Sequence, residues 1–199
     1  MRFPTLLLAA VAWTAPLAAQ SALRLSAGAT YSSALIDDGV LSTKLRPAIA
    51  PTVGLGIAIP TGKGPYRVVA EVSYARSALN VISTTGTGDN DQLAAVATVT
   101  ALILAEGALR GAFRWQVGGG AVFYRPTERQ GVFQNGGTRR WMLAGGVVWR
   151  HPLTATMDLL VTGRVDAHAF STDVLQARGY GESQSVQRFG LLLGVSRRL

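Results

Sequence analysis

The stretch Met157–Phe170, which reads MDLLVTGRVDAHAF, decides the fold. Its residues alternate in character with a period of two, which is the period of a β-strand because successive side chains point to opposite faces. One face carries polar and charged side chains, namely Asp158, Thr162, Arg164, Asp166 and His168. The other carries apolar or small residues, namely Leu159, Val161, Gly163, Val165, Ala167 and Ala169. An apolar outer face and a polar inner face are typical of the strands of a transmembrane β-barrel.

The same alternation recurs in other segments of the chain. They span residues 23–31, 48–59, 66–78, 92–104, 113–124, 140–150 and 188–198. We therefore predict an all-β chain in which eight antiparallel strands close into an up-and-down transmembrane β-barrel. Two segments are less regular. Pro51 cannot donate a hydrogen bond to a neighbouring strand, which suggests a bulge or a late strand start, and the alanine-rich segment 92–104 also fits a helix.

The lengths of the connecting links predict how the barrel is oriented. The long, polar links are 37–47, 83–91, 125–139 and 171–185, and the short ones are 60–65, 105–111 and 151–155. Outer-membrane barrels have short periplasmic turns and longer external loops. Because long and short links alternate, we expect both termini of the barrel in the periplasm and the long loops outside.

The N-terminal residues do not follow the strand pattern. Arg2 supplies a positive charge, residues 6–13 a short apolar core, and residues 17–19 the small side chains of a cleavage site. The apolar run is shorter than the roughly 20 residues that a membrane helix needs. We expect residues 1–19 to be a cleaved signal peptide and residues 20–199 to form the barrel domain. A buried N-terminal helix is the alternative, which Pro16 disfavours.

The composition excludes several kinds of function. The chain of 199 residues contains no cysteine, so a disulfide framework, thiolate chemistry and cysteine-based metal sites are excluded. Its formal net charge of +8 raises the question of nucleic acid binding. The arginines are spread along strands and loops, however, and the leader directs the chain out of the cytoplasm. We expect no nucleic-acid partner, no metal and no cofactor.

Aromatic residues of the outward face gather toward the two ends of the predicted strands. Near the periplasmic ends we expect Tyr66, Phe113, Trp115 and Trp149, and near the external ends Tyr31, Tyr74, Phe123, Trp141 and Phe189. The interfaces of a bilayer favour aromatic rings. The placement therefore predicts two aromatic girdles.

The chain resembles the small outer-membrane barrels of the OmpA/OmpX type in three features. These are the signal peptide, the eight alternating segments, and the end of the sequence at the eighth segment. The C-terminal stretch GLLLGVSRRL, residues 190–199, is similar to the terminal-strand signal that the barrel-insertion machinery reads in that family. That signal usually ends in Phe, whereas this chain ends in Leu199. The resemblance implies an integral outer-membrane protein of a Gram-negative bacterium, with outer-membrane lipid, lipopolysaccharide and the insertion machinery as partners. It says almost nothing about function.

Charged residues at inward positions predict the state of the lumen. They are Arg24, Arg67, Glu71, Arg114, Asp158, Arg164, Asp166, His168 and Arg188. The interior of an eight-stranded barrel is just wide enough to be filled by its own side chains. Guanidinium groups bind carboxylates through paired hydrogen bonds. We predict a charge network that fills a closed lumen, and a structural or surface-interaction role without enzymatic activity.

Two alternative functions stay open. Asp166, His168 and Ser171 provide the parts of a nucleophilic site near the external rim, as in a lipid A deacylase or acyltransferase. Against this, Ser171 falls on the opposite face from His168 and begins a loop. The other alternative is a soluble, secreted, lipocalin-like carrier, which would expose long apolar rows to water.

Arginines in and beside the long links predict contacts with lipopolysaccharide. They are Arg125, Arg129, Arg139 and Arg140. Guanidinium groups bind phosphates through bidentate hydrogen bonds, and lipopolysaccharide carries phosphates at the external surface. The alternative is that these charges are simply solvated.

Overall fold

The computed structural model describes residues 21–38, 43–62, 64–83, 92–129, 131–177 and 184–199. The strands are β1 (Ala22–Ser32), β2 (Ile36–Asp38), β3 (Thr43–Pro47), β4 (Ala50–Pro60), β5 (Arg67–Ser83), β6 (Gln92–Arg110), β7 (Phe113–Pro126), β8 (Thr138–Pro152), β9 (Met157–Phe170) and β10 (Gln184–Arg198). The helical segments are η1 (Gly131–Phe133) and α3 (Asp173–Ala177). No helix in this part of the chain is long and apolar enough to cross a membrane. The predicted signal peptide, residues 1–19, and link residues 84–91 lie outside the described residues.

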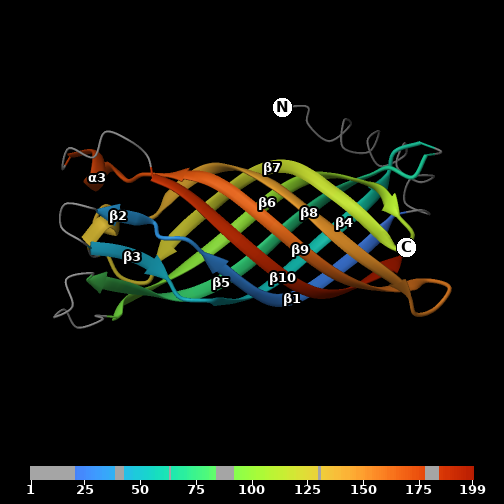
Figure 1. Ribbon diagram of the computed structural model, residues 1–199, viewed down its shortest axis with the longest axis horizontal. Helices are drawn as coiled ribbons and strands as arrows, with labels where there is room; N and C mark the ends of the chain where they lie inside the picture. Colours follow the sequence, from blue (N-terminus) through green and yellow to red (C-terminus); the bar gives the residue numbers. More distant parts are fainter. Residues whose placement is uncertain (1–20, 39–42, 63, 84–91, 130, 178–183) are drawn as a thin grey trace, which may run out of the picture.

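Eight of the described strands close into one barrel. They are β1, β4 and β5 to β10. Consecutive barrel strands pair antiparallel, and the last, β10, pairs back with β1. The predicted all-β, up-and-down architecture is confirmed. Figure 1 shows the tilted strands wrapped around a single long axis. The C-terminus and the short turns lie at one end, which we call the turn end. The opposite end, with α3, β2 and β3, is the loop end.

The alternation of side chains is the reason that these segments form barrel strands. In β10, Leu191 and Leu193 are 65% and 58% exposed on the outer surface, whereas Leu192 between them is 3% exposed. The predicted faces of β9 are confirmed. From Gly163 onward, exposed and buried residues alternate, and the buried ones include the inward residues Arg164, Asp166 and His168. The outward apolar residues include Leu23, Leu25, Val53, Leu55, Val72, Ile103, Val117, Leu143, Val147 and Val165. A soluble monomer does not expose apolar rows of this extent, which disfavours the lipocalin-like alternative.

Segment 92–104 belongs to a strand and not to the alternative helix. β6 pairs along its length with β5 on one side and β7 on the other. It also continues beyond the predicted end to Arg110, so that the predicted link 105–111 shrinks to a tight turn at Gly111 and Ala112. Gly111 has φ 56°, a left-handed conformation that glycine adopts without strain. The extended strand brings residues 105–110 into the barrel wall.

The link 37–47 is more ordered than the sequence indicates. β2 and β3 form a hairpin, and β3 pairs with the end of β5, with Arg46 opposite Asn80. The chain leaves the sheet at Ala48 and Ile49 before β4 begins at Ala50. Pro51 therefore lies at the beginning of β4, and the pairing of β4 with β5 starts one residue later, at Thr52. This late start is the arrangement that Pro51 predicts.

Candidate functional site: the lumen and its two ends

The middle of the lumen is spanned by an ion-paired arginine. Arg164 on β9 donates from Nη1 to Oε1 of Glu71 on β5, at 2.6 Å. Its Nε lies 3.0 Å from Oδ1 of Asp166, which is the next inward residue of the same strand. In the closed ring of strands β5 and β9 lie four positions apart, so the pair joins opposite walls. The structure thus brings together three of the residues predicted for the charge network.

A second buried cluster lies closer to the turn end. Both terminal nitrogens of Arg24 on β1 donate to the two carboxylate oxygens of Glu106 on β6, at 2.7 and 2.9 Å. Nε2 of Gln116 also donates to Oε2 of Glu106, at 2.9 Å. The carboxylate is completely buried and accepts a hydrogen bond at each oxygen. Glu106 is not predicted as an inward residue, because residues 105–111 have the composition of a link; only the length of β6 reveals its place in the lumen.

The remaining predicted network residues have other partners. Arg188 donates to Oγ1 of Thr100 at 3.0 Å, across the lumen from β10 to β6. At the turn end, Asp158 accepts a hydrogen bond from Arg150 at 2.5 Å. Arg114 donates to the carbonyl oxygen of Pro65 at 3.3 Å and forms no ion pair with any described residue. The lumen is therefore filled by several separate polar clusters and not by one continuous network.

His168 belongs to an aromatic cluster and not to a charged one. Its Nε2 lies 2.7 Å from the hydroxyl oxygen of Tyr124 on β7. The Tyr124 ring packs against Phe170 and Phe133, with ring centroids 5.3 and 6.3 Å apart, and the last two rings are 5.9 Å apart. Phe133 comes from η1, in the link between β7 and β8. This link therefore inserts an aromatic side chain into the barrel at the loop end.

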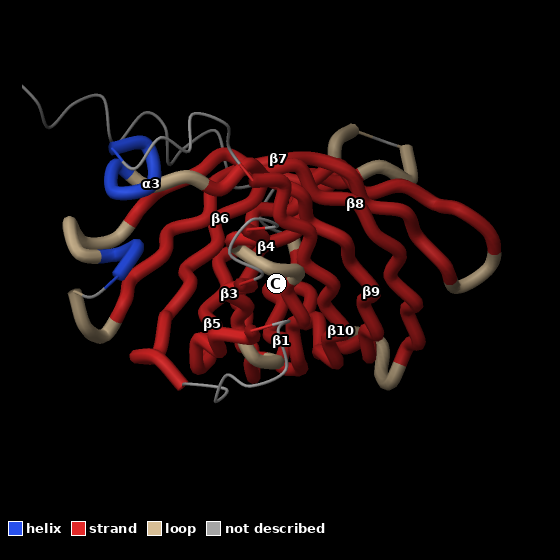
Figure 2. Tube along the Cα trace, turned by 60° about the vertical axis from the view of Figure 1, so that its left-hand side comes forward, coloured by secondary structure: helices blue, strands red, loops and turns tan. Residues whose placement is uncertain are grey.

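Further apolar side chains complete the closure of the loop end. They come from segments outside the barrel strands and from the parts of the strands nearest the loop end: Leu35, Ile36, Leu45, Leu79, Val96, Leu175 and Val186. All are buried. We call this set, together with Tyr124, Phe133 and Phe170, the apolar cap. Figure 2 shows the helical segments and loops gathered beyond the strands at the loop end, whereas short turns connect the strands elsewhere.

The predicted parts of a nucleophilic site are not assembled. His168 bonds to Tyr124 and Asp166 pairs with Arg164, and no hydrogen bond joins His168 to Asp166 or Ser171 among the described residues. The Ser171 hydroxyl oxygen is buried without a hydrogen-bond partner in the described structure. Its carbonyl oxygen accepts from Nε and Nη2 of Arg140. None of the described residues makes the hydrogen bond to this hydroxyl that an activating base would make.

The arginines predicted to contact lipopolysaccharide do not form one group. Arg125, Arg129 and Arg139 are exposed at the loop end. The guanidinium of Arg139 also lies over the ring of Trp141, 5.8 Å from the centroid. Arg140 is an inward residue of β8 whose guanidinium is held by the Ser171 carbonyl, so it is not available at the outer surface. Only three of the four predicted residues can meet a ligand from outside.

The aromatic residues predicted for the girdles lie on the outer surface. Tyr31 and Phe189 are register partners near the loop end, with ring centroids 6.2 Å apart. Tyr74 lies in the middle of β5, because this strand is longer than predicted. Val99 of β6 is the register partner of both Tyr74 and Phe123, so these two rings lie at the same height along the barrel axis. At the turn end, Tyr66 packs near Trp115 at 6.3 Å, and Trp149 pairs with Phe113 in register and stacks on His151.

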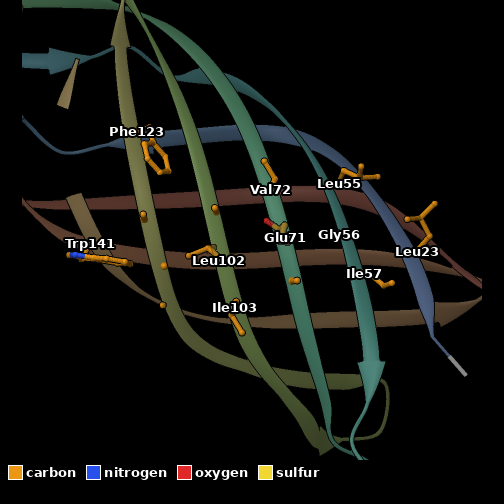
Figure 3. A pocket seen from close by; sticks show the side chains of 15 residues that line it. Leu23, Leu55, Gly56, Ile57, Glu71, Val72, Leu102, Ile103, Phe123 and Trp141 are labelled. Carbon is orange, nitrogen blue, oxygen red and sulfur yellow. The ribbon is translucent and has the colours of Figure 1, made fainter. Parts of the chain in front are cut away.

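The outer surface also contains an apolar hollow of about 750 Å³. Small residues on neighbouring strands, among them Ala70, Ala101 and Gly119, leave this space between larger side chains. In Figure 3, Phe123 and Trp141 lie on one side of it and Leu55 and Leu23 on the other. The hollow faces away from the lumen and offers almost no polar group. It therefore belongs to the apolar outer surface and not to an interior binding site.

No protein-family model and no curated protein matches the sequence. The fold does match solved structures. Neisserial surface protein A matches with a TM-score of 0.53 at 10% identity, over 90% of this chain and 97% of that one. A major outer membrane protein of Thermus thermophilus matches with a TM-score of 0.50 at 13% identity, over 90% of this chain and 99% of that one.

This chain has the fold of the small eight-stranded outer-membrane barrels. The predicted OmpA/OmpX-type architecture is thereby confirmed. At such low identity the likeness concerns the fold alone, and function is carried by sites and not by folds.

Proposed function

We propose that this chain is an integral protein of the bacterial outer membrane, with a closed lumen and a structural or surface-interaction role. The observation that carries the proposal is the distribution of polarity across the barrel wall. Rows of exposed apolar side chains cover the outside, whereas Arg24, Glu106, Arg164 and Glu71 are paired inside. A surface of this kind is stable against lipid, and closure of the barrel leaves no unpaired strand edge within it.

The cross-lumen pairs and the apolar cap support a lumen without an open channel. The Arg164–Glu71 pair joins opposite walls in the middle, and the buried rings of Tyr124, Phe133 and Phe170 fill the loop end. An ion that crossed the barrel would have to displace both. A barrel of eight strands has no spare interior space for a water-filled pore besides these groups.

Membrane fractionation and conductance measurements test this proposal. We expect the expressed protein in the outer-membrane fraction, resistant to extraction with alkaline carbonate, and shifted in mobility when heated before electrophoresis in detergent. In planar bilayers we expect no conductance steps of the size of a general porin. Recovery in the soluble periplasm would contradict the membrane location, and porin-sized steps would contradict the closed lumen.

We further propose that the turn end and both barrel termini face the periplasm. Short turns at one end and longer connections at the other support this orientation, as does the usual arrangement of outer-membrane barrels. In this orientation Arg125, Arg129 and Arg139 would meet lipopolysaccharide phosphates, and β10 would carry the signal for the insertion machinery. Replacing the three arginines by glutamine should reduce the lipopolysaccharide that co-purifies. Unchanged co-purification would contradict the contact.

Enzymatic activity is not part of the proposal. His168 is engaged with Tyr124 in a buried aromatic environment, and Asp166 is engaged with Arg164. We expect that lipid A from cells expressing the protein has the same mass spectrum as lipid A from cells without it. A change in acylation that disappears in the His168→Ala variant would contradict a non-enzymatic role.

A further inference from the structure

At the turn end the lumen opens into a cavity of about 380 Å³ that is rich in arginine. Arg67 on β5, Arg114 on β7, Arg150 on β8 and Arg198 on β10 line it, together with Asp158 on β9. Four separate strands therefore bring guanidinium groups to one space. The residues at its rim, including Gly111 and Pro152, are exposed, whereas Asp158 is buried at 2% exposure. The cavity is thus open to the surrounding medium on one side.

The carboxylates near this cavity are already engaged. Asp158 accepts a hydrogen bond from Arg150. Glu106 lies opposite Arg67 in the register of β5 and β6, but both of its oxygens are bound by Arg24. In the described part of the chain no carboxylate forms an ion pair with Arg67, Arg114 or Arg198. Four guanidinium groups against one carboxylate leave a formal excess of three positive charges in the lining.

This excess contrasts with the two ion-paired clusters higher in the lumen. Elsewhere in the lumen Arg24 and Arg164 each face a carboxylate within 3.0 Å. A group of like charges in a partly enclosed space is repulsive, and an anion that enters the space relieves the repulsion. The arrangement therefore selects for a ligand with more than one negative charge.

The geometry of the lining favours a phosphate over a carboxylate. A carboxylate is satisfied by one guanidinium fork. A phosphate monoester carries a charge of about −1.5 to −2 and three acceptor oxygens, so it can bind several forks that approach from different directions. Arg67, Arg114 and Arg198 come from different strands of the wall and provide this arrangement. Arginine is also the side chain that best matches phosphate geometry.

We propose that the cavity at the turn end binds a phosphate group, either of a soluble phosphate monoester or of a lipid headgroup. The site follows from the side chains that line the cavity and does not depend on the proposed membrane orientation. Arg67 and Arg198 are the key ligands, because neither has a carboxylate partner in the described structure. Arg114 assists from β7, where its hydrogen bond to the Pro65 carbonyl holds it at the rim.

Calorimetry on the full barrel in a non-ionic, phosphate-free detergent tests the proposal. The probes are glycerol 3-phosphate and micelle-dissolved phosphatidic acid, at constant ionic strength set with sodium chloride. We expect saturable binding of at least one probe, weakened about tenfold by Arg67→Gln and by Arg198→Gln. Arg76→Gln removes the same charge at an exposed position on the outer face of β5 and should leave the affinity unchanged. Each variant is first checked for the heat-dependent mobility shift of a folded barrel.

The outcomes separate the sources of the phosphate. Binding of glycerol 3-phosphate supports a soluble ligand, and binding of phosphatidic acid alone supports a lipid headgroup. The proposal is overturned if neither probe binds saturably, or if Arg76→Gln weakens binding as much as Arg67→Gln, which would indicate attraction by net charge only. If Arg67→Gln does not fold, Arg198→Gln decides, because Arg198 is exposed at the end of β10. Neither result depends on the fractionation test of membrane location.

Discussion

Arg164 and Glu71 join opposite walls of the barrel through a single hydrogen-bonded ion pair of 2.6 Å. The two residues are 93 positions apart in the chain and come from strands that are not paired with each other. Both side chains are largely buried, so each charge depends on the other for its stability. Asp166 contributes a second carboxylate to the same guanidinium. This arrangement makes Arg164 the central cation of the lumen.

Removal of this cation should destabilise the barrel strongly. The Arg164→Met variant leaves the carboxylate of Glu71 without its ion-pair partner and removes the guanidinium beside Asp166. Breaking a buried pair in this way costs about 3–5 kcal/mol. We expect a loss of this order in the free energy of unfolding, measured by urea titration of tryptophan fluorescence in lipid vesicles. Arg139→Met at the exposed loop end is the control and should change it by less than about 0.5 kcal/mol. Equal stability of the two variants would show that the pair is not coupled.

The pair of Arg24 and Glu106 should show strong coupling in a double-mutant cycle. Glu106→Gln leaves Arg24 without its carboxylate, and Arg24→Met leaves a completely buried carboxylate bound only by Gln116. Each single change should therefore lower the free energy of unfolding by about 3 kcal/mol. The double variant should lose less than the sum of both, by about 1–3 kcal/mol. Additive losses would mean that the two residues act independently.

Much of this architecture follows from local sequence, and the faces of β9 and β10 illustrate why. A strand that separates lipid from a polar lumen must alternate, so its pattern is visible without knowledge of any partner. Glu106 could not be assigned in the same way. The residues that follow it, Gly107 to Gly111, have the composition of a turn, and only pairing with β5 and β7 extends β6 to Arg110.

Contacts across the lumen depend on quantities that the sequence does not display. Which inward residue of β9 faces Glu71 is determined by the tilt and stagger of the closed barrel. The same limit applies to His168, whose inward position predicts a place in the charge network. Its partner is Tyr124, which is also an inward residue but was not assigned a role. Likewise the β2–β3 hairpin forms only because β5 extends past the barrel and offers an edge.

The glycines of the barrel wall should tolerate substitution according to their position. A Cβ atom on Gly120 of β7 would collide with the carbonyl oxygen of Ala101 on β6, whereas a Cβ atom on Gly163 of β9 would meet no atom within 4 Å. Forcing an extra carbon into a packed backbone contact costs about 1–3 kcal/mol. We therefore expect Gly120→Ala to lower the urea midpoint and Gly163→Ala to leave it unchanged or slightly higher. Similar midpoints for both variants would show that the wall adjusts without cost.

The apolar cap should control access to the loop end of the barrel. Phe133 is 2% exposed, and it is the residue by which η1 packs on Tyr124 and Phe170. Replacing a buried phenylalanine by alanine costs about 3–5 kcal/mol, and here the cost falls on the docking of one link and not on the barrel strands. We expect Phe133→Ala to be cut by protease within residues 127–137 at least about tenfold faster than the unmodified protein, with an unchanged urea midpoint. Val132→Ala, a change at the partly buried neighbouring residue, is the matched control and should accelerate cleavage much less. Equal cleavage rates for Phe133→Ala and the unmodified protein would mean that other contacts hold the link. A lowered urea midpoint would mean that the cap and the barrel unfold as one unit.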